Sequence, residues 1–142
     1  MNTKNYLPLF LFSFCLLFSS FSTPHQIDIW EDLEVFHQAI ALTFHPAEDG
    51  DFKPIRNDSD ELLEAAKRLS ETKLPAYFEK KENAALKEEV LKNIKMLLEQ
   101  SEELHNLAQN KNTTDTTLFT SLKKLHDTYH HIEVLNKKSR QK

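Results

Sequence analysis

The stretch from Leu118 to Asn136, LFTSLKKLHDTYHHIEVLN, decides the fold of this chain. Its apolar residues recur at spacings of three and four, namely Leu118, Leu122, Leu125, Tyr129 and Ile132. Positions at this spacing share one face of a helix. The stretch therefore predicts an amphipathic helix that buries one side against other elements.

Two histidines, His126 and His130, lie one turn apart on the flank of this apolar face. At about 100° per residue they fall within a quarter-turn of its centre, and Glu133 falls nearly on the centre. His131 points to the opposite side. Buried polar groups need partners, because leaving them unpaired is costly. We interpret His126, His130 and Glu133 as inward-facing groups that help to hold a metal ion.

The N-terminus has the organisation of a secretory signal peptide. Lys4 is the only charge before an apolar and hydroxylated run, Tyr6 to Phe21, and small residues at Ser20 and Ser22 suit a signal peptidase. The run is somewhat short for a membrane span. We predict a signal peptide over residues 1–22 and an exported mature protein, periplasmic or secreted, with an uncleaved anchor as the alternative.

Composition limits what the mature part, residues 23–142, can do. It contains no cysteine, because the single Cys15 lies in the leader, and Phe14 before it is too large for a lipoprotein signal. Without Lys4 the chain carries 17 basic and 22 acidic residues, a formal net charge of −5. No basic stripe is available for nucleic acid, and no stable membrane insertion is expected after signal cleavage.

The chain has one glycine, Gly50, whereas sheet folds need several residues at positive φ in their turns. Stretches rich in Glu, Lys, Leu and Ala favour helices instead, so the fold class is predicted to be all-α. An up-down-up-down antiparallel four-helix bundle is expected from short connections between helices at about residues 28–44, 54–73, 81–110 and 115–136. Residues 136–142 are expected to fray.

Prolines and a polar turn set these predicted boundaries. Pro46 disfavours helical geometry at the residue before it, so the first helix should end there. Pro54 suits the first turn of the second helix, and Pro75 should end that helix before an apolar plug over residues 74–78. Thr113 or Thr114 can cap the last helix.

The bundle topology brings histidines of the first and last helices to a similar height. The first helix has a core stripe of its own, with His37 on its edge: Ile29, Leu33, Phe36, Ile40 and Phe44. If Phe44 lies beside Leu118, then His37 lies about seven residues from that end and His126 about eight, with His130 roughly 6 Å further along. The three histidines are therefore predicted ligands.

Other residues are candidates for the same site. His45 and His105 can complete the cluster or form a second position nearer the end of the bundle. Glu133 is either a ligand or an acceptor that orients an imidazole. Imidazole suits several transition metals, and zinc or copper is expected first. The alternative is a buried polar cluster satisfied by Glu133, Tyr129 and water.

Catalysis is not predicted. The spacing of His126 and His130 equals that of the HExxH metalloprotease helix, but Asp127 stands where that motif has glutamate, and it points outward. The chain is therefore interpreted as a non-enzymatic protein.

The segments Phe36 to Pro46, FHxxxxxTFHP, and Leu125 to His130, LHDTYH, resemble small exported four-helix-bundle proteins of the cytochrome c-prime type. The resemblance implies the scaffold. The chain lacks CxxCH, so covalent haem is excluded. A non-covalent haem would usually require an axial methionine and a histidine, and the first helix has Ile40 and Ala41 at the positions expected for such a methionine.

The sequence therefore supports three functions in order. The first is an exported bundle that binds zinc or copper without catalysis. The second is a non-covalent haem protein for electron transfer, with His126 or His130 as axial ligand. The third is a structural or partner-binding envelope protein without a cofactor.

Overall fold

A computed structural model describes residues 29–141, so the predicted signal peptide, Asp28 and His25 lie outside the described residues. Within this range the chain is helical without strands and consists of α1 (Glu31–Glu48), α2 (Lys53–Glu71), the short 3-10 helices η1 (Ala76–Glu79) and η2 (Lys81–Asn83), α3 (Ala84–Gln109) and α4 (Asp115–Arg140). The all-α prediction is confirmed for this part of the chain.

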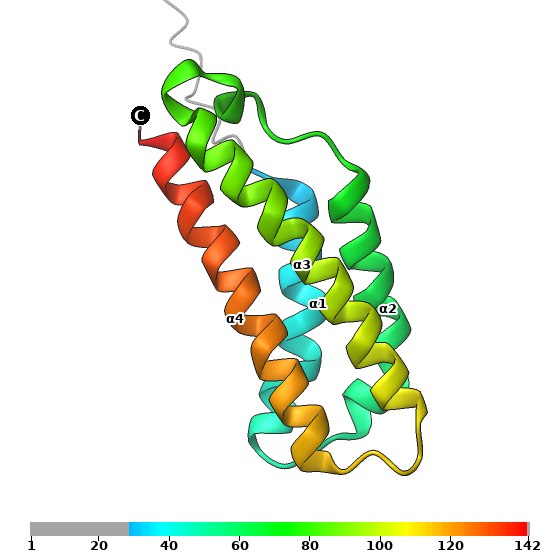
Figure 1. The fold of residues 1–142 in the computed structure, drawn as a ribbon. Helices are drawn as coiled ribbons and strands as arrows, with labels where there is room; N and C mark the ends of the chain where they lie inside the picture. Colours follow the sequence, from blue (N-terminus) through cyan, green and yellow to red (C-terminus); the bar gives the residue numbers. More distant parts are fainter. Residues whose placement is uncertain (1–28, 142) are drawn as a thin grey trace, which may run out of the picture.

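The four long helices lie side by side along one axis (Figure 1). Each helix contacts the next one along the chain, and α1 also contacts α4. Polar contacts join the first turn of one helix to the end of another: Arg68 of α2 pairs with Asp32 of α1, and Asn83 before α3 donates to the Ser139 carbonyl of α4. These contacts place α4 between α1 and α3.

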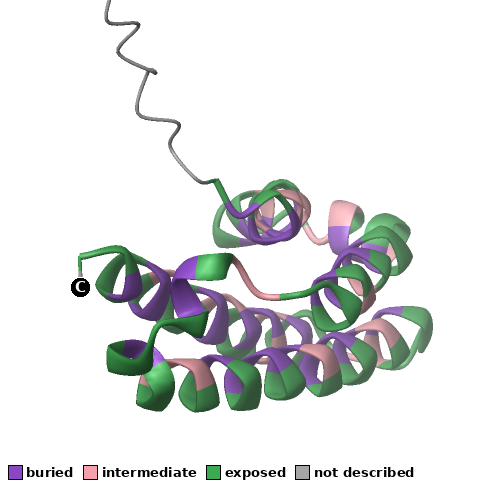
Figure 2. Ribbon diagram, turned by 90° about the horizontal axis from the view of Figure 1, so that it is seen from above, coloured by how far each residue is buried: buried purple, intermediate pink, exposed green. Residues whose placement is uncertain are grey.

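One hydrophobic core connects all four helices, and the buried residues line their facing sides (Figure 2). The predicted stripe of α4 is confirmed, with Leu118, Leu122, Leu125 and Ile132 fully buried and Tyr129 nearly so. In the first predicted helix Ile29 is 60% exposed, contrary to expectation, and Trp30 is buried instead. Trp30 packs edge-on against Phe78 of η1, which closes one end of the core.

The predicted end of α1 at residue 44 is wrong, because the helix continues through Pro46 to Glu48. Gly50, at φ +84°, then reverses the chain. The N–H of Asp51 donates to the Pro46 carbonyl at 2.9 Å and the N–H of Gly50 to the Ala47 carbonyl at 3.1 Å. This is the Schellman arrangement, which supplies donors to the last carbonyls of the helix. The stop signal is therefore Gly50, and Pro46 fits inside the last turn.

The predicted fraying from residue 136 is also wrong, because α4 continues to Arg140. Asn136 and Ser139 are buried, and the Tyr77 hydroxyl donates to Asn136 Oδ1. At the other end of α4 the predicted cap is confirmed, since Thr114 Oγ1 accepts the N–H of Thr117 at 3.2 Å. Over residues 29–141 no helix combines the length and apolar character that crossing a bilayer requires.

Candidate metal centre

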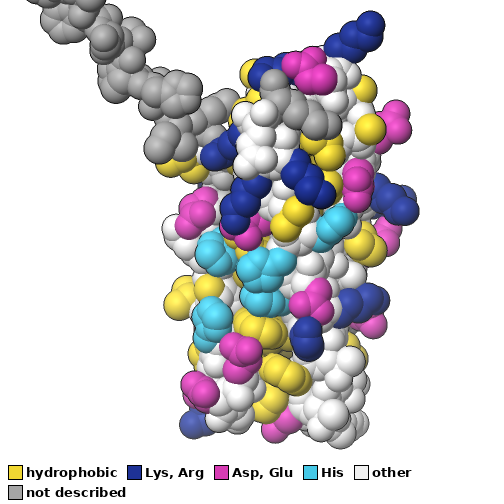
Figure 3. Space-filling model, turned by 90° about the vertical axis from the view of Figure 1, so that its left-hand side faces the viewer, with side chains coloured by type: hydrophobic (Ala, Val, Ile, Leu, Met, Phe, Trp, Pro, Cys, Tyr) yellow, Lys and Arg dark blue, Asp and Glu magenta, His cyan; other side chains and the backbone are white. Residues whose placement is uncertain are grey.

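Helix α4 places His126 and His130 at the edge of its buried stripe, where it meets α1. Figure 3 shows histidine side chains gathered on this face, with apolar side chains among them. The His130 side chain is 49% exposed and His126 is partly buried. The prediction that these histidines face inward is therefore wrong: aliphatic residues fill the core, and the two histidines beside them lie at the surface where α4 meets α1.

The two imidazoles point their Nε2 atoms at each other. These nitrogens lie 3.2 Å apart, and the ring planes are nearly perpendicular at 88°. His130 Nδ1 lies 3.3 Å from Glu133 Oε2. A carboxylate can only accept, so the contact is a hydrogen bond when His130 carries a proton on Nδ1, and a neutral ring of this tautomer presents a lone pair at Nε2. Two arrangements account for this separation: an N–H of His126 that donates to the lone pair, or a metal ion bound by both nitrogens.

Glu133 orients the pair from the side and does not face the two Nε2 atoms. Although burial favours its protonated form, hydrogen bonds from Lys137 and His130 lower the pKa of Glu133 below its ordinary value. It is therefore a carboxylate at neutral pH. Of the two roles predicted for Glu133, the geometry favours the acceptor that fixes an imidazole.

His126 is held against an aromatic ring of α1. Its imidazole stacks on Phe44 with ring centroids 3.9 Å apart and planes at 9°. Phe44 in turn stacks on Phe119 of α4 at 6.0 Å. Burial, followed by the nearby His130, lowers the pKa of His126. His126 is therefore more readily neutral, and so available as a ligand, than an exposed histidine.

His45 of α1 is the nearest further imidazole. Its ring centroid lies 6.5 Å from that of His126, and its Nδ1 lies 3.0 Å from Glu48 Oε2. The spacing of His45 and Glu48 repeats that of His130 and Glu133, an i, i+3 pair on one helix. Sequence reasoning missed Glu48, although this spacing in the chain was a usable signal.

His37 lies on the same face but not with the pair. Its ring stacks on Tyr129 at 4.9 Å and 10°, and Tyr129 also contacts the ring of His130 at 5.2 Å. The prediction placed Phe44 beside Leu118, at the start of α4. In the structure Phe44 lies beside His126, two turns further along, because α1 continues past residue 44. This shift in register moves His37 along the bundle, away from the predicted cluster. Burial raises the pKa of Tyr129, which stays protonated beside it.

His105 is in a different part of the molecule. Its Nδ1 lies 3.1 Å from Ser59 Oγ, which bridges α3 to α2, and Gln109 donates to the same oxygen. His105 therefore does not complete the His126–His130 cluster, and the second position predicted for it nearer the end of the bundle stays a prediction. His131 pairs with Glu89 of α3 at 2.9 Å, on the other side of α4.

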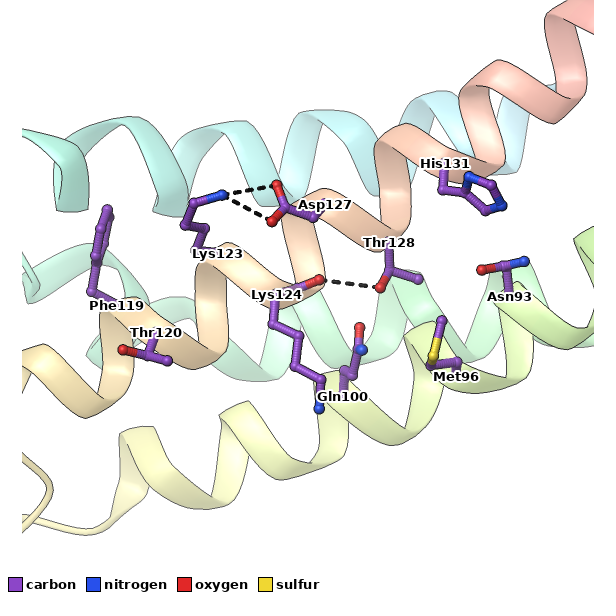
Figure 4. A pocket seen from close by; sticks show the side chains of 10 residues that line it. All are labelled: Asn93, Met96, Gln100, Phe119, Thr120, Lys123, Lys124, Asp127, Thr128 and His131. Atoms are coloured by element: carbon purple, nitrogen blue, oxygen red, sulfur yellow. Dashed lines mark hydrogen bonds and ion pairs between the residues drawn. The ribbon is translucent and has the colours of Figure 1, made fainter.

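A separate groove of about 760 Å³ follows the seam between α3 and α4 (Figure 4). Met96 and Gln100 of α3 and Lys124 of α4 are among the residues that line it. Gln100 is 5% exposed, and its Oε1 has no hydrogen-bond partner among the described residues. None of the predicted ligands lines this groove, so it is not part of the metal centre.

The arrangement offers two ligand nitrogens at the correct separation for one ion. With Zn–N bonds of about 2.0–2.1 Å and tetrahedral angles, two ligand nitrogens lie about 3.3 Å apart. The observed 3.2 Å between the Nε2 atoms is close to this value. Among residues 29–141, however, no three His, Cys, Asp or Glu side chains are grouped so that they could hold an ion as they stand.

Comparison of the chain with protein-family models, curated proteins and solved structures finds no match. The resemblance to the cytochrome c-prime type therefore remains a prediction.

Proposed function

We propose that the protein is an exported, non-enzymatic, up-down-up-down antiparallel four-helix bundle that binds a transition metal, zinc or copper, through His126 and His130. The observation that carries this proposal is the 3.2 Å separation of two Nε2 atoms whose rings are held from outside by other side chains. Glu133 fixes His130, and the ring of Phe44 fixes His126.

This geometry suits a bare ion better than haem. Two histidines on the opposite axial positions of haem iron would have their nitrogens about 4 Å apart, with the iron between them, at metal–nitrogen distances of about 2 Å. His126 and His130 are closer, come from one helix and approach the ion from the same side. They therefore resemble neighbouring ligands of a tetrahedral ion.

Calorimetric titration of the purified chain with zinc, and separately with copper, tests the proposal. Stoichiometric binding is expected, and the double variant His126→Ala, His130→Ala should lose it. The matched control is His131→Ala, which removes an imidazole of the same helix from the α3 side. Equal loss in the control, or full binding by the double variant, would refute the proposed site.

A further inference from the structure

The His126–His130 pair is incomplete as a metal site. Zinc takes four ligands in structural sites, and the pair supplies two. The next imidazole, that of His45, is hydrogen-bonded to Glu48, and its ring centroid lies 6.5 Å from that of His126. Among the described residues no third donor stands in place. The missing ligands must come from movement of His45, from water or from another molecule.

The pair also lies where another molecule can reach it. His130 is about half exposed, and Figure 3 shows histidine side chains at the surface on one face of the molecule. The rings lie over the seam between the two helices and not to one side of α4, because His126 stacks on Phe44 of α1. A two-fold axis along this seam would bring the same two nitrogens of a second copy to the ion.

The charges of the two helices suit such an arrangement. Helix α1 has four acidic residues and no lysine or arginine: Glu31, Asp32, Glu34 and Glu48. Helix α4 has five basic residues, Lys123, Lys124, Lys137, Lys138 and Arg140, against three acidic ones. A two-fold axis parallel to the helices sets α1 of one copy over α4 of the other. On the α1–α4 side of the molecule, Glu34 of α1 and Lys137 of α4 line one hollow. The rotation therefore brings Glu34 of each copy toward Lys137 of the other, so that the contact occurs twice, as in an isologous interface.

We propose that a second copy of this chain completes the site, so that one zinc ion bridges two bundles through four imidazoles, His126 and His130 of each copy. This inference rests on the proposed function and names the partner at that site.

The face is too small to hold two copies without the ion. Helix α1 has 18 residues, which corresponds to a length of about 27 Å, and two adjacent helices are roughly 20 Å wide. The buried area is then roughly 550 Å² per copy, below the about 800 Å² per partner of a standard stable interface. The chain is therefore a monomer without zinc and a dimer with it.

Sedimentation of the purified chain with and without zinc tests the inference. The mass should double when zinc is added and return to that of one chain with EDTA. Calorimetry should give one zinc ion for every two chains. His126→Ala should lose both zinc binding and the mass change, and His131→Ala should lose neither.

A second variant distinguishes zinc binding from association with the second copy. Ala41 lies between His37 and His45 on the seam face of α1, at four-residue spacing from each. Ala41→Gln adds neutral bulk to this face without removing a ligand, so zinc should still bind while the mass stays that of one chain.

Two results would overturn the inference in different ways. One zinc ion per chain with no change in mass rejects the second copy and leaves the proposed function standing; loss of that binding in His45→Ala would then identify His45 as the third ligand. Absence of zinc binding rejects the dimer, and absence of both zinc and copper binding rejects the proposed function as well. A zinc-dependent mass change that persists in His126→Ala also rejects the bridging pair.

Discussion

At the scale of single residues, position beside the core gives these histidines their properties. His126 lies at the boundary between an aliphatic core and solvent, stacked on Phe44. His130, one turn further, is half exposed and tied to Glu133. A fully buried imidazole pair would exclude a hydrated ion, and a fully exposed pair would not be held at one separation. At the edge of the apolar stripe of α4 an ion can reach the imidazoles, and neighbouring side chains still fix the distance between them.

His126 should titrate at lower pH than an exposed histidine, because burial and the nearby His130 lower its pKa. Its imidazole carbon proton, followed by NMR over a pH series without metal, should give a midpoint below the ordinary value of 6.5.

The same shift makes stability depend on pH. Below about pH 6.5 the unfolded chain takes up a proton at His126 before the folded chain does. The free energy of unfolding should therefore fall as the pH drops from there through the folded-state pKa. Denaturant unfolding of His126→Gln should show a smaller fall over this window, and an equal fall in both proteins would contradict the assignment.

Glu133 should matter for affinity although it is not a ligand. Removing a carboxylate that orients a ligating histidine typically lowers metal affinity about 10- to 100-fold. Glu133→Ala is expected to weaken zinc binding by this amount in calorimetry. The control is Asp127→Ala, an exposed carboxylate of the same helix that pairs with Lys123. If both substitutions weakened zinc binding equally, the cause would be the loss of a negative charge near the site and not the loss of the group that orients His130.

At the scale of elements, the ends of the helices depend on a few polar contacts. The turn after α1 rests on Gly50, and the ends of α3 and α4 meet at Asn83. Asn83 is fully buried, and its Nδ2 donates to the carbonyls of Tyr77 and Ser139 at 2.7 and 2.8 Å. These contacts lie at the ends of α1 and α4, the two helices that carry the candidate metal centre.

Gly50→Ala should destabilise the protein through the backbone alone. The residue has φ +84°, and no atom lies within 4 Å of an added Cβ. A left-handed conformation costs an alanine about 1 kcal/mol relative to glycine. Denaturant unfolding should show a loss of this size, and Gly50→Asn should lose less because asparagine tolerates the conformation. Unchanged stability of the alanine variant would show that the turn adapts.

Asn83→Ala should cost more than a surface change. Two buried carbonyls would lose their donor, and an unsatisfied buried group costs about 1–3 kcal/mol. Thermal or denaturant unfolding can be compared with that of Asn106→Ala, which changes an exposed asparagine in the last turn of α3. The control should change stability by less than about 0.5 kcal/mol. If the two variants lost the same free energy of unfolding, a water molecule would have to replace Asn83 Nδ2 as the donor to the two carbonyls.

At the scale of the whole molecule, zinc bound at the α1–α4 face as proposed would make the stability of the fold depend on the metal. A ligand that binds only the folded state stabilises it by about 2.7 kcal/mol at one hundred times its dissociation constant. Zinc should therefore raise the melting temperature.

If zinc also bridges two copies, the melting temperature should rise with protein concentration, but only when zinc is present. Calorimetric scans at several chain concentrations measure this directly. The double variant His126→Ala, His130→Ala serves as the control and should show neither effect. A zinc-induced rise that is independent of chain concentration would support the metal and contradict the dimer.

Much of this molecule follows from the spacing of its apolar residues. The three- and four-residue period placed Leu118, Leu122, Leu125 and Ile132 in the core, and it paired His126 with His130 on one side of a helix. Such inferences hold because neighbours within a helix are separated by a fixed rotation and rise, independent of the rest of the chain.

The sequence could not assign the other members of the predicted site. His37 lies on Tyr129 because of the register of α1 against α4, and His105 lies beside Ser59 because of the packing of α3 against α2. Both positions depend on how whole helices pack. Whether a flanking side chain is buried depends likewise on how closely the next helix approaches. Contacts within one helix are local and follow from residue order, whereas contacts between helices depend on loop lengths and side-chain volumes along the entire interface.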